Sequence, residues 1–355
     1  MRHPLARLTI SGNPVQQNSG SRAIKTSECA LVFAADDNFT EGLAVAIHSA
    51  LKHLPPGVSP EIYLLDNGLS EESHARLRRT VAAARRDVDL RRVQIPGHRL
   101  GPMQADSHLR PATYARVLIP EVLPPHIRRV VYLDSDVLVR RDVSPLFSIE
   151  LGGALLGAVR DYFTSSTAHE LSGVRDRSNP RPYFNAGVLV IDVIAWRTAG
   201  LVDRVLEYAR SGEPLRWADQ DALNGVVEDW YELDARWNVQ HVPTTIFRAD
   251  FPLVLDERGE AIYGERRSNY RASAIVHFIG SVKPWHYSCA AAGTYGWVCG
   301  LIRSRWYTPR ETVVWLVRWH RPRLRYWVGR WRKRLRTRGG LTKQDRQVGR
   351  NLGKW

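Results

Sequence analysis

The sequence contains little cysteine and no long apolar run. Its three cysteines, Cys29, Cys289 and Cys299, form neither a disulfide framework nor a close metal-binding pair, which fits a reducing cytoplasm. No stretch approaches the roughly 18 apolar residues that a membrane-spanning helix needs. Residues 1–28 lack the apolar segment of a secretory signal and are polar from 11 to 27. We therefore expect a disordered leader at 1–28 and no membrane-spanning segment.

Acidic residues are scarce at one end of the chain. Residues 301–355 contain 17 of the 51 Lys and Arg but only Glu311 and Asp345 of the 36 acids. The net charge of +15, which at first suggests nucleic-acid binding, therefore comes from this segment, and the first 300 residues are electrically balanced. The change in composition predicts one boundary near residue 300, between a folded body at 29–300 and a basic, Trp-rich tail at 301–355.

Strand-like and helix-like segments alternate along the body. Apolar runs predict strands at 29–35, 61–66, 88–95, 129–133 with 137–139 as its continuation, 155–159, 188–193, 231–238 and 273–279. Helical spacing of apolar residues predicts helices at 43–54, at 71–86 after a capping Ser70, and at 217–227. This alternation predicts an α/β domain with a mostly parallel central sheet, in which ligands bind at the carboxyl ends of the strands.

Two aspartates, Asp134 and Asp136, emerge where a buried strand ends. Such a pair is not informative by itself, because three Asp-x-Asp triplets occur where about one is expected by chance, and Asp87 with Asp89 fits an ordinary solvated turn. At a strand end, however, two adjacent carboxylates repel each other unless a cation neutralises them. Hard oxygen ligands of this kind suit Mg²⁺ or Mn²⁺.

A second polar cluster follows the strand predicted at 273–279. His277, Gly280 and Lys283 are spaced three residues apart. Glycine lets the backbone approach an anion closely, lysine supplies a point charge for phosphate, and histidine can complete a metal shell. A lone histidine is more often a hydrogen-bonded structural residue. A nitrogen ligand, if His277 supplies one, favours Mn²⁺ over Mg²⁺.

Two further segments could hydrogen-bond a sugar. One is residues 183–187, with Asn185 shortly before Gly187, and the other is Asp219-Gln220-Asp221 at the start of a helix. Each has an ordinary explanation, since Asn and Gly are common turn residues and Asp is a common helix cap.

Six motifs, taken together and in order, resemble glycosyltransferase family 8, and within it the bacterial lipooligosaccharide and lipopolysaccharide galactosyltransferases. The motifs are FAADDN at 33–38, YAR at 114–116, YLDSDVLV at 132–139, FNAGV at 184–188, DQDALNG at 219–225 and HFIGSVKPW at 277–285. The resemblance covers roughly residues 29 to 290. It implies the GT-A fold, a Rossmann-like α/β domain, and transfer of a galactose or glucose from a UDP-sugar with retention of configuration.

The resemblance also implies roles for individual residues. Asp134, Asp136 and His277 would hold Mn²⁺, or Mg²⁺, against the UDP diphosphate, and Ser135 would contribute mainly backbone. The remaining donor contacts would come from Ala34, Ala35, Asp36 and Asn38 at the base and ribose, Gly280 and Lys283 at the diphosphate, and Arg116, Asn185, Ala186, Asp219 and Gln220 around the hexose. Arg116, Asp219 and Gln220 would be catalytic. Because the amide of Gln220 is a poor nucleophile, we favour front-face attack by the acceptor over a covalent glycosyl-enzyme.

The acceptor side rests on the same resemblance. Five residues would line it: His108, Asp161, Trp217, Thr244 and Ile279. Trp217 and Ile279 depart from the related sequences, which have Tyr and Cys there, so the acceptor sugar could differ.

The tail from 301 to 355 contains Trp and Leu at helical spacing among many arginines. Thr312, Trp315, Leu316 and Trp319 form one stripe before Pro322, and a second stripe runs from Leu324 to Leu335. Basic amphipathic helices with Trp bind anionic membranes, which predicts a peripheral enzyme on the cytoplasmic face of the inner membrane with a glycolipid acceptor. The alternatives are a basic extension whose Trp pack on the body, and a nucleic-acid-binding module that uses the Arg and Trp mixture. With the enzyme, no nucleic-acid partner is expected.

Overall fold

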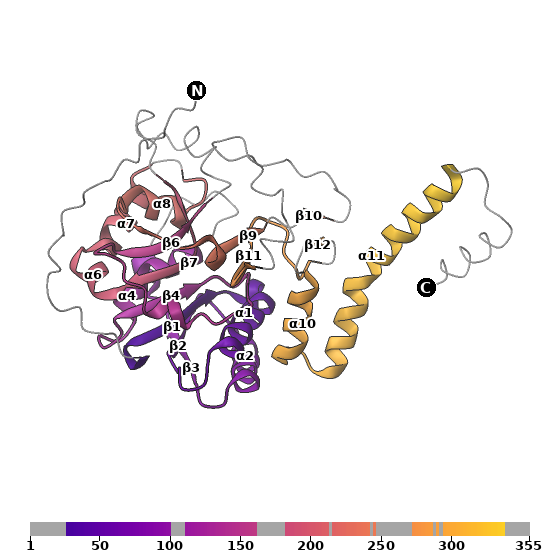
Figure 1. Ribbon diagram of the computed structural model, residues 1–355, viewed down its shortest axis with the longest axis horizontal. Coiled ribbons are helices and arrows are strands. Elements are labelled where there is room, and N and C mark those ends of the chain that lie inside the picture. Colours follow the sequence, from indigo (N-terminus) through magenta and orange to yellow (C-terminus); the bar gives the residue numbers. More distant parts are fainter. Residues whose placement is uncertain are drawn as a thin grey trace, which may run out of the picture.

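A seven-stranded sheet with helices on both faces forms the centre of the computed structural model (Figure 1). The structure describes residues 26–100, 111–161, 182–212, 215–241, 244–245, 272–286, 289–290 and 294–337. The strand order is β3-β2-β1-β4-β7-β6-β8. The strands are β1 Cys29–Ala35, β2 Glu61–Asp66, β3 Leu90–Gln94, β4 Arg129–Leu133, β6 Leu156–Arg160, β7 Phe184–Asp192 and β8 Tyr231–Glu232.

Most neighbouring strands in this sheet run parallel, as the sequence predicted. Parallel pairs join β1 to β2 and β4, β2 to β3, and β6 to β8, whereas β7 runs antiparallel to β4 and β6. The strand β1 is a continuous apolar run because both of its faces are covered. Leu31 and Phe33 point into one hydrophobic core, and Ala30 and Val32 point into the other.

Different helices cover the two faces (Figure 1). The core on one face includes side chains of α1 Thr40–His53, α2 Glu71–Ala84 and α10 Thr294–Ser304, and the core on the other includes side chains of α6 Val193–Thr198, α7 Leu201–Arg210 and α8 Asp219–Val226. The cap predicted for α2 is present, since the Ser70 hydroxyl accepts from Ser73 N. Further short helices are α3 Gly97–Leu100 and α4 Ile119–Val122, with 3-10 helices at Thr26–Glu28, Asp37–Phe39, Pro111–Leu118, Ser144–Phe147 and Ala235–Asn238.

Two strand predictions were wrong in detail. Residues 137–139 do not continue β4: they form β5 Val137–Val139 in a second sheet, ordered β5-β11-β9 with β11 Ile275–Phe278 and β9 Val239–His241. The chain turns between the two sheets at Asp134, so this aspartate and Asp136 lie at a crossing. The strand predicted at 231–238 ends at Glu232, because the Asp234 side chain accepts from Arg236 N and caps a 3-10 turn. A third sheet pairs β10 Thr244–Thr245 with β12 Cys289–Ala290.

The boundary predicted near residue 300 falls inside α10, so the change in composition does not coincide with a break in the fold. Trp297 and Leu301 of α10 belong to the same core as Trp315 and Trp319 of α11 Pro309–Thr337. Packing on the body, and not a membrane, therefore explains the first Trp stripe of the predicted tail.

A proline favours a break between the two stripes of the tail, but α11 continues through Pro322. Proline in a helix interior costs about 3 kcal/mol, and packing of the adjoining turns can offset this. Among the described helices, none combines the length and apolarity needed to cross a membrane. The predicted leader lies outside the described residues up to residue 25, and so does the tail beyond residue 337.

Candidate active site

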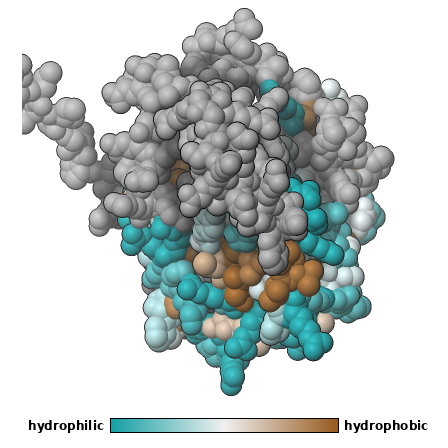
Figure 2. Space-filling model, turned by 90° about the vertical axis from the view of Figure 1, so that its right-hand side faces the viewer, coloured by the Kyte–Doolittle hydropathy of each residue, from teal (hydrophilic) through white to brown (hydrophobic). Residues whose placement is uncertain are grey.

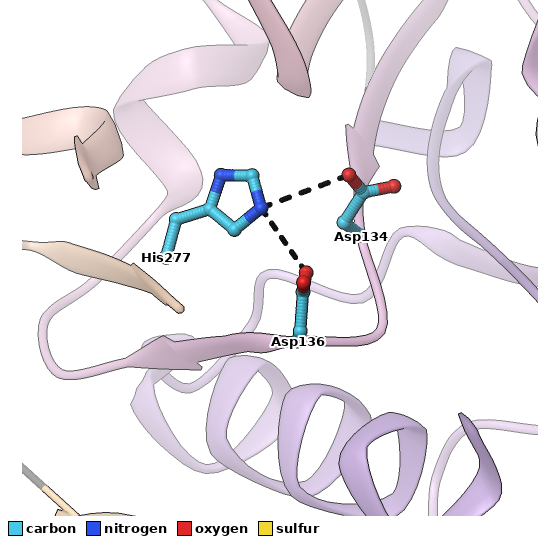
Figure 3. Close-up of side chains that lie close together, drawn as sticks. All are labelled: Asp134, Asp136 and His277. Atoms are coloured by element: carbon cyan, nitrogen blue, oxygen red, sulfur yellow. Dashed lines mark ion pairs between the residues drawn. The ribbon is translucent and has the colours of Figure 1, made fainter. Parts of the chain in front are cut away.

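Three predicted metal ligands come together at the crossing between the two sheets. Asp134 follows β4, Asp136 precedes β5, and His277 lies on β11, which pairs with β5 so that His277 stands opposite Val137. His277 Nε2 lies 3.1 Å from Asp136 Oδ1 and 3.8 Å from Asp134 Oδ2 (Figure 3). Potential ligand atoms of the three side chains all lie within 4.8 Å of one another.

The hydrogen bonds around His277 fit a metal ligand. His277 Nδ1 lies 3.0 Å from Asn238 Oδ1, and Asn238 uses its Nδ2 to donate to Asn185 Oδ1 at 2.8 Å. Asn238 Oδ1 is an acceptor, so His277 Nδ1 donates to it, and the ring directs its Nε2 at the two carboxylates. Asp136 Oδ1 is buried and faces His277 Nε2. One nitrogen and two carboxylates that converge on one point suit a divalent cation.

Gly187 makes room for this arrangement. A Cβ atom at position 187 would lie 2.1 Å from His277 Cε1 and 2.9 Å from Asp134 Oδ2. The segment containing Asn185 and Gly187 is therefore not the turn that its sequence also allowed. It lies within β7, and its glycine permits the imidazole to approach the strand.

Lys283 joins the same group of side chains. Its Nζ donates to Asp136 Oδ2 at 2.5 Å and to the Phe278 carbonyl at 2.8 Å. Burial works against ionisation of Asp136, but the charges and hydrogen bonds of Lys283 and His277 together outweigh burial and hold the pKa of Asp136 well below its ordinary value. Gly280 has φ +83°, a left-handed conformation that suits glycine, and it turns the chain between His277 and Lys283.

Arg116 links two neighbouring sets of side chains. One set, the metal group, is Asp134, Asp136 and His277, and the other, the sugar-side network, is Asp161, Asn185, Asp219 and Gln220. The Arg116 guanidinium pairs with Asp134 Oδ1 at 3.0 Å and Asp219 Oδ2 at 2.8 Å, and it donates to the Ala186 carbonyl at 2.6 Å. The Tyr132 ring lies under the guanidinium, with 4.8 Å between Arg116 Cζ and the ring centroid. The Tyr132 hydroxyl donates to Asp134 Oδ1 at 2.8 Å. All of these partners are fixed, so Arg116 holds two buried or partly buried carboxylates in place.

Asp161, Asn185 and Gln220 form a connected network beside Arg116. Asp161 Oδ2 accepts from Asn185 Nδ2 at 3.0 Å and from Gln220 Nε2 at 3.1 Å. Gln220 Oε1 accepts from Ala186 N at 2.9 Å. The sequence assigned Asp161 to the acceptor side, whereas here it is buried and orients two side chains of the predicted hexose site.

The start of α8 carries a strained residue and an unusual carboxyl. Ala218 has φ +45°, which non-glycine residues rarely adopt and which costs of order 1–3 kcal/mol. This conformation immediately precedes Asp219. Burial raises the pKa of Asp219 to about 6, although the charge of Arg116 opposes the shift. Strain and a perturbed carboxyl at one helix start are typical of a functional site.

The residues predicted to contact the base and ribose lie at and just after the end of β1. Ala34 and Ala35 end the strand, and the Asp36 carboxylate accepts from Asn38 N at 2.9 Å. Phe39, an exposed aromatic ring directly after this segment, was not among the predicted site residues. Its only signal was its position beside the predicted base contacts.

The remaining acceptor residues are less well defined. Trp217 is 41% exposed and stacks against Arg216, with 5.3 Å from the guanidinium to the ring centroid. Ile279 follows β11 and is partly buried. His108 lies outside the described residues, and Thr244 is described only as part of β10. Asn238, the buried partner of His277, was not predicted either, and it ended a segment predicted as a strand.

Comparisons with known proteins identify the family of this chain. The model of the family "Glycosyl transferase family 8" matches residues 30–289. General stress protein A of Bacillus subtilis is 30% identical over 72% of this chain and 87% of its own length. Lipopolysaccharide 1,2-glucosyltransferase of Escherichia coli is 23% identical over 74% and 75%. A crystal structure of the galactosyltransferase LgtC with donor and acceptor sugar analogues has a TM-score of 0.63 and 26% identity, covering 81% of this chain and 99% of that one.

The likeness to the LgtC structure confirms the predicted GT-A fold, and the family match confirms the resemblance drawn from the six motifs. The comparisons support an enzyme and give no support to the nucleic-acid-binding alternative.

Proposed function

This chain belongs to glycosyltransferase family 8, and we propose that it transfers a hexose, galactose or glucose, from a UDP-sugar to a glycan acceptor with retention of configuration. The observation that carries the proposal is the convergence of Asp134, Asp136 and His277 beside Lys283. It supports binding of a diphosphate through a divalent cation, because a nitrogen and two carboxylates leave other positions on the ion open for phosphate oxygens.

We assign the donor contacts by part of the substrate. Asp36, Asn38 and the end of β1 would bind uracil and ribose, and the exposed ring of Phe39 offers a surface for the base to stack on. Lys283 and the backbone at Gly280 would bind the diphosphate. The bound cation, which we expect to be Mn²⁺ because of the imidazole ligand, would neutralise charge that develops on the leaving phosphate. Lys283 adds a fixed positive charge at the same place.

The hexose would lie between Arg116 and the network of Asp161, Asn185 and Gln220. Both heteroatoms of the Gln220 amide already have partners, so Gln220 is held in one orientation beside the predicted anomeric carbon. An amide so held orients the sugar better than it attacks it. We therefore propose that the acceptor hydroxyl attacks from the face that the phosphate leaves, and that the phosphate accepts the hydroxyl proton. A trapped glycosyl adduct on Asp219 or Gln220 would overturn this mechanism.

For the acceptor we propose a sugar of a lipopolysaccharide or lipooligosaccharide core. Trp217 supports this because an exposed indole can stack on a sugar ring, and Ile279 would face the same substrate. His108 and Thr244 stay predictions from the resemblance.

The first test is a screen of UDP-sugars for Mn²⁺-dependent hydrolysis in the absence of acceptor. We expect turnover with UDP-galactose or UDP-glucose and loss of that turnover in Asp134→Ala. Asp89→Ala is the matched control, because Asp89 belongs to another Asp-x-Asp triplet and lies exposed at the surface. Equal turnover in the two variants, or turnover unaffected by chelation, would contradict a metal-dependent transferase.

We also propose that α11 binds an anionic membrane, through a different face from the one predicted. Trp315 and Trp319 are buried, so they are not available to lipid. Val313, Val314 and Val317 are exposed instead. Figure 2 faces the side of α10 and α11 and shows a brown hydrophobic group bordered by teal hydrophilic residues. Exposed arginines of the same helix include Arg310, Arg318, Arg321 and Arg325.

Exposed valines beside arginines suit the interface of an anionic bilayer. This would make the protein a peripheral enzyme of the cytoplasmic membrane face. Sedimentation with vesicles containing phosphatidylglycerol tests the proposal: Val313→Asp with Val317→Asp should abolish binding, and Glu72→Gln, a change on α2, should not. Binding that survives the double substitution would refute this face.

A further inference from the structure

Helix α11 lies outside the region matched by the family, yet it contacts the loop that carries Lys283. Trp319 Nε1 donates to the carbonyl of Pro284 at 3.0 Å, and Trp319 is fully buried. Pro284 directly follows Lys283, whose Nζ reaches Asp136. Trp319 of α11 is therefore hydrogen-bonded to the loop that carries Lys283, the positively charged side chain of the proposed donor site.

A chain of aromatic rings makes the same connection. Trp319 stacks on Trp315 at 5.9 Å between centroids, Trp315 contacts Trp297 at 6.1 Å, and Trp297 contacts Trp285 at 5.7 Å. Trp285 then meets Phe39 edge to face at 5.9 Å. The rings thus run from α11 to both loops of the proposed nucleotide site, the loop after β11 and the loop after β1.

The space around Trp285 leaves the loop little freedom. A Cβ atom at Gly42 of α1 would lie 2.6 Å from the Trp285 ring, and Trp297 of α10 packs against the same ring. Interiors packed this closely transmit small displacements. If the Pro284 carbonyl lost its donor, it would be a buried acceptor without a partner, and the loop would have to shift to find one.

We propose that Trp319 is a positioning residue for the donor site: its hydrogen bond to Pro284 fixes the loop so that Lys283 is aimed at the diphosphate. This inference rests on the proposed function, in which Lys283 binds phosphate. It makes α11 part of the donor site as well as a membrane-binding helix. A cut at the boundary predicted near residue 300 would therefore remove part of the machinery and not just an appendage.

The test measures binding of UDP in the presence of Mn²⁺ by titration calorimetry, together with kcat and KM for hydrolysis of the UDP-sugar. Trp319→Phe removes the indole N–H and keeps an aromatic ring. We expect the Kd of UDP and the KM to rise about 5- to 10-fold with kcat changed less than about 2-fold, because a phosphate contact made in both ground and transition states affects KM. Trp196→Phe is the matched control, since Trp196 is also fully buried on α6 but its Nε1 has no hydrogen-bond partner.

A double-mutant cycle with Lys283→Met decides whether Trp319 acts through Lys283. We expect Trp319→Phe to weaken UDP binding less than about 2-fold further when Lys283→Met is present, because coupled residues are not additive. Additive effects, or equal effects of Trp319→Phe and Trp196→Phe, would overturn the inference and leave the proposed function intact. If Lys283→Met alone leaves UDP binding unchanged, the phosphate role of Lys283 fails instead, and the inference falls with it.

A second replacement guards against misfolding of Trp319→Phe. Incorporation of benzothienylalanine at position 319 exchanges the N–H for sulfur and keeps the shape of the indole. The same loss of UDP binding is expected from it, and unchanged binding would overturn the role of the hydrogen bond.

Discussion

The metal group and the sugar-side network lie next to each other but are built differently. In the metal group, ligand atoms of Asp134, Asp136 and His277 converge within 4.8 Å of one another. In the sugar-side network, Asn185 and Gln220 have partners for their amide groups within the protein. The first arrangement could hold a cation, whereas the amides of the second are already hydrogen-bonded.

Under the proposed function, this difference would give two ways of binding one donor. A cation held by the metal group would attract the diphosphate by charge, which acts over a distance and depends on salt. The sugar-side network would offer a preformed surface that discriminates by geometry and loses little entropy when the sugar binds. Substitutions that connect or separate the two regions therefore test the comparison directly.

Arg116 is the connection whose loss should have the largest effect, because it pairs with Asp134 in one region and Asp219 in the other. Arg116→Met would leave the carboxylates of Asp134 and Asp219 without the positive charge of the guanidinium. We expect turnover to fall more than about 100-fold and the free energy of unfolding to fall by about 3–5 kcal/mol, as for other broken buried ion pairs. Hydrolysis assays and chemical denaturation measure the two effects.

Arg116→Lys is the control for Arg116→Met, since it keeps the charge but cannot reach Asp134, Asp219 and the Ala186 carbonyl at once. It should recover much of the stability and little of the turnover. Full activity in Arg116→Lys would show that charge alone matters and that the two regions need no common geometry.

Asn238 allows the two regions to be separated. Asn238→Leu removes the acceptor for His277 Nδ1–H, and we expect Mn²⁺ affinity to fall about 10-fold, as for other partners of metal-bound histidines. Asn238→Asp keeps an acceptor for His277 but cannot donate to Asn185, so it should retain Mn²⁺ affinity and lower kcat. Electron paramagnetic resonance of free Mn²⁺ reports affinity without turnover. Equal Mn²⁺ affinity in wild type and Asn238→Leu would refute the tautomer argument.

Much of the body followed from sequence because its signals are local. β1 is a continuous apolar run, and Ser70 is followed by two glutamates at a helix start, so both elements were predicted with correct positions. The grouping of Asp134, Asp136 and His277 was also predicted, from the strand that ends before Asp134, the polar cluster at His277 and the family resemblance, and their binding of a metal stays a prediction. The sequence predicted that residues 137–139 continue β4. They instead form β5 and pair with β11, and this pairing brings the three side chains together.

The features that escaped prediction depend on contacts between distant segments. Gly187 stands two residues after Asn185, and the reason for the glycine appears only when the His277 ring is placed against it. The stripe with Trp315 and Trp319 fits a membrane or a protein core equally well, because helical spacing does not specify what a helix packs against. Asn238 carried no signal, since a buried amide on a 3-10 turn resembles any other polar residue.

Replacing Asp219 has the smallest expected effect, a change in the free energy of unfolding whose direction follows from the raised pKa. The pKa of Asp219 is raised from 3.8 to about 6, so the folded protein binds more protons than the unfolded chain between these values. Stability attached to this group is therefore present below about pH 4 and lost as the pH rises through about 6. Asp219→Asn removes the ionisation and should stabilise the protein at pH 7.5 but not at pH 4.

The upper bound on this gain is about 3 kcal/mol from two pKa units, and we expect about 1 kcal/mol because an amide faces Arg116 less favourably than a carboxylate does. Thermal melting at both pH values measures it, with Asp89→Asn as the exposed control. A gain at pH 7.5 combined with loss of turnover would mean that the sugar-side network retains a destabilising charge for function. A loss of stability at pH 7.5 would instead mean that the pairing with Arg116 outweighs burial, and that this region is held together by charge much as the metal group is.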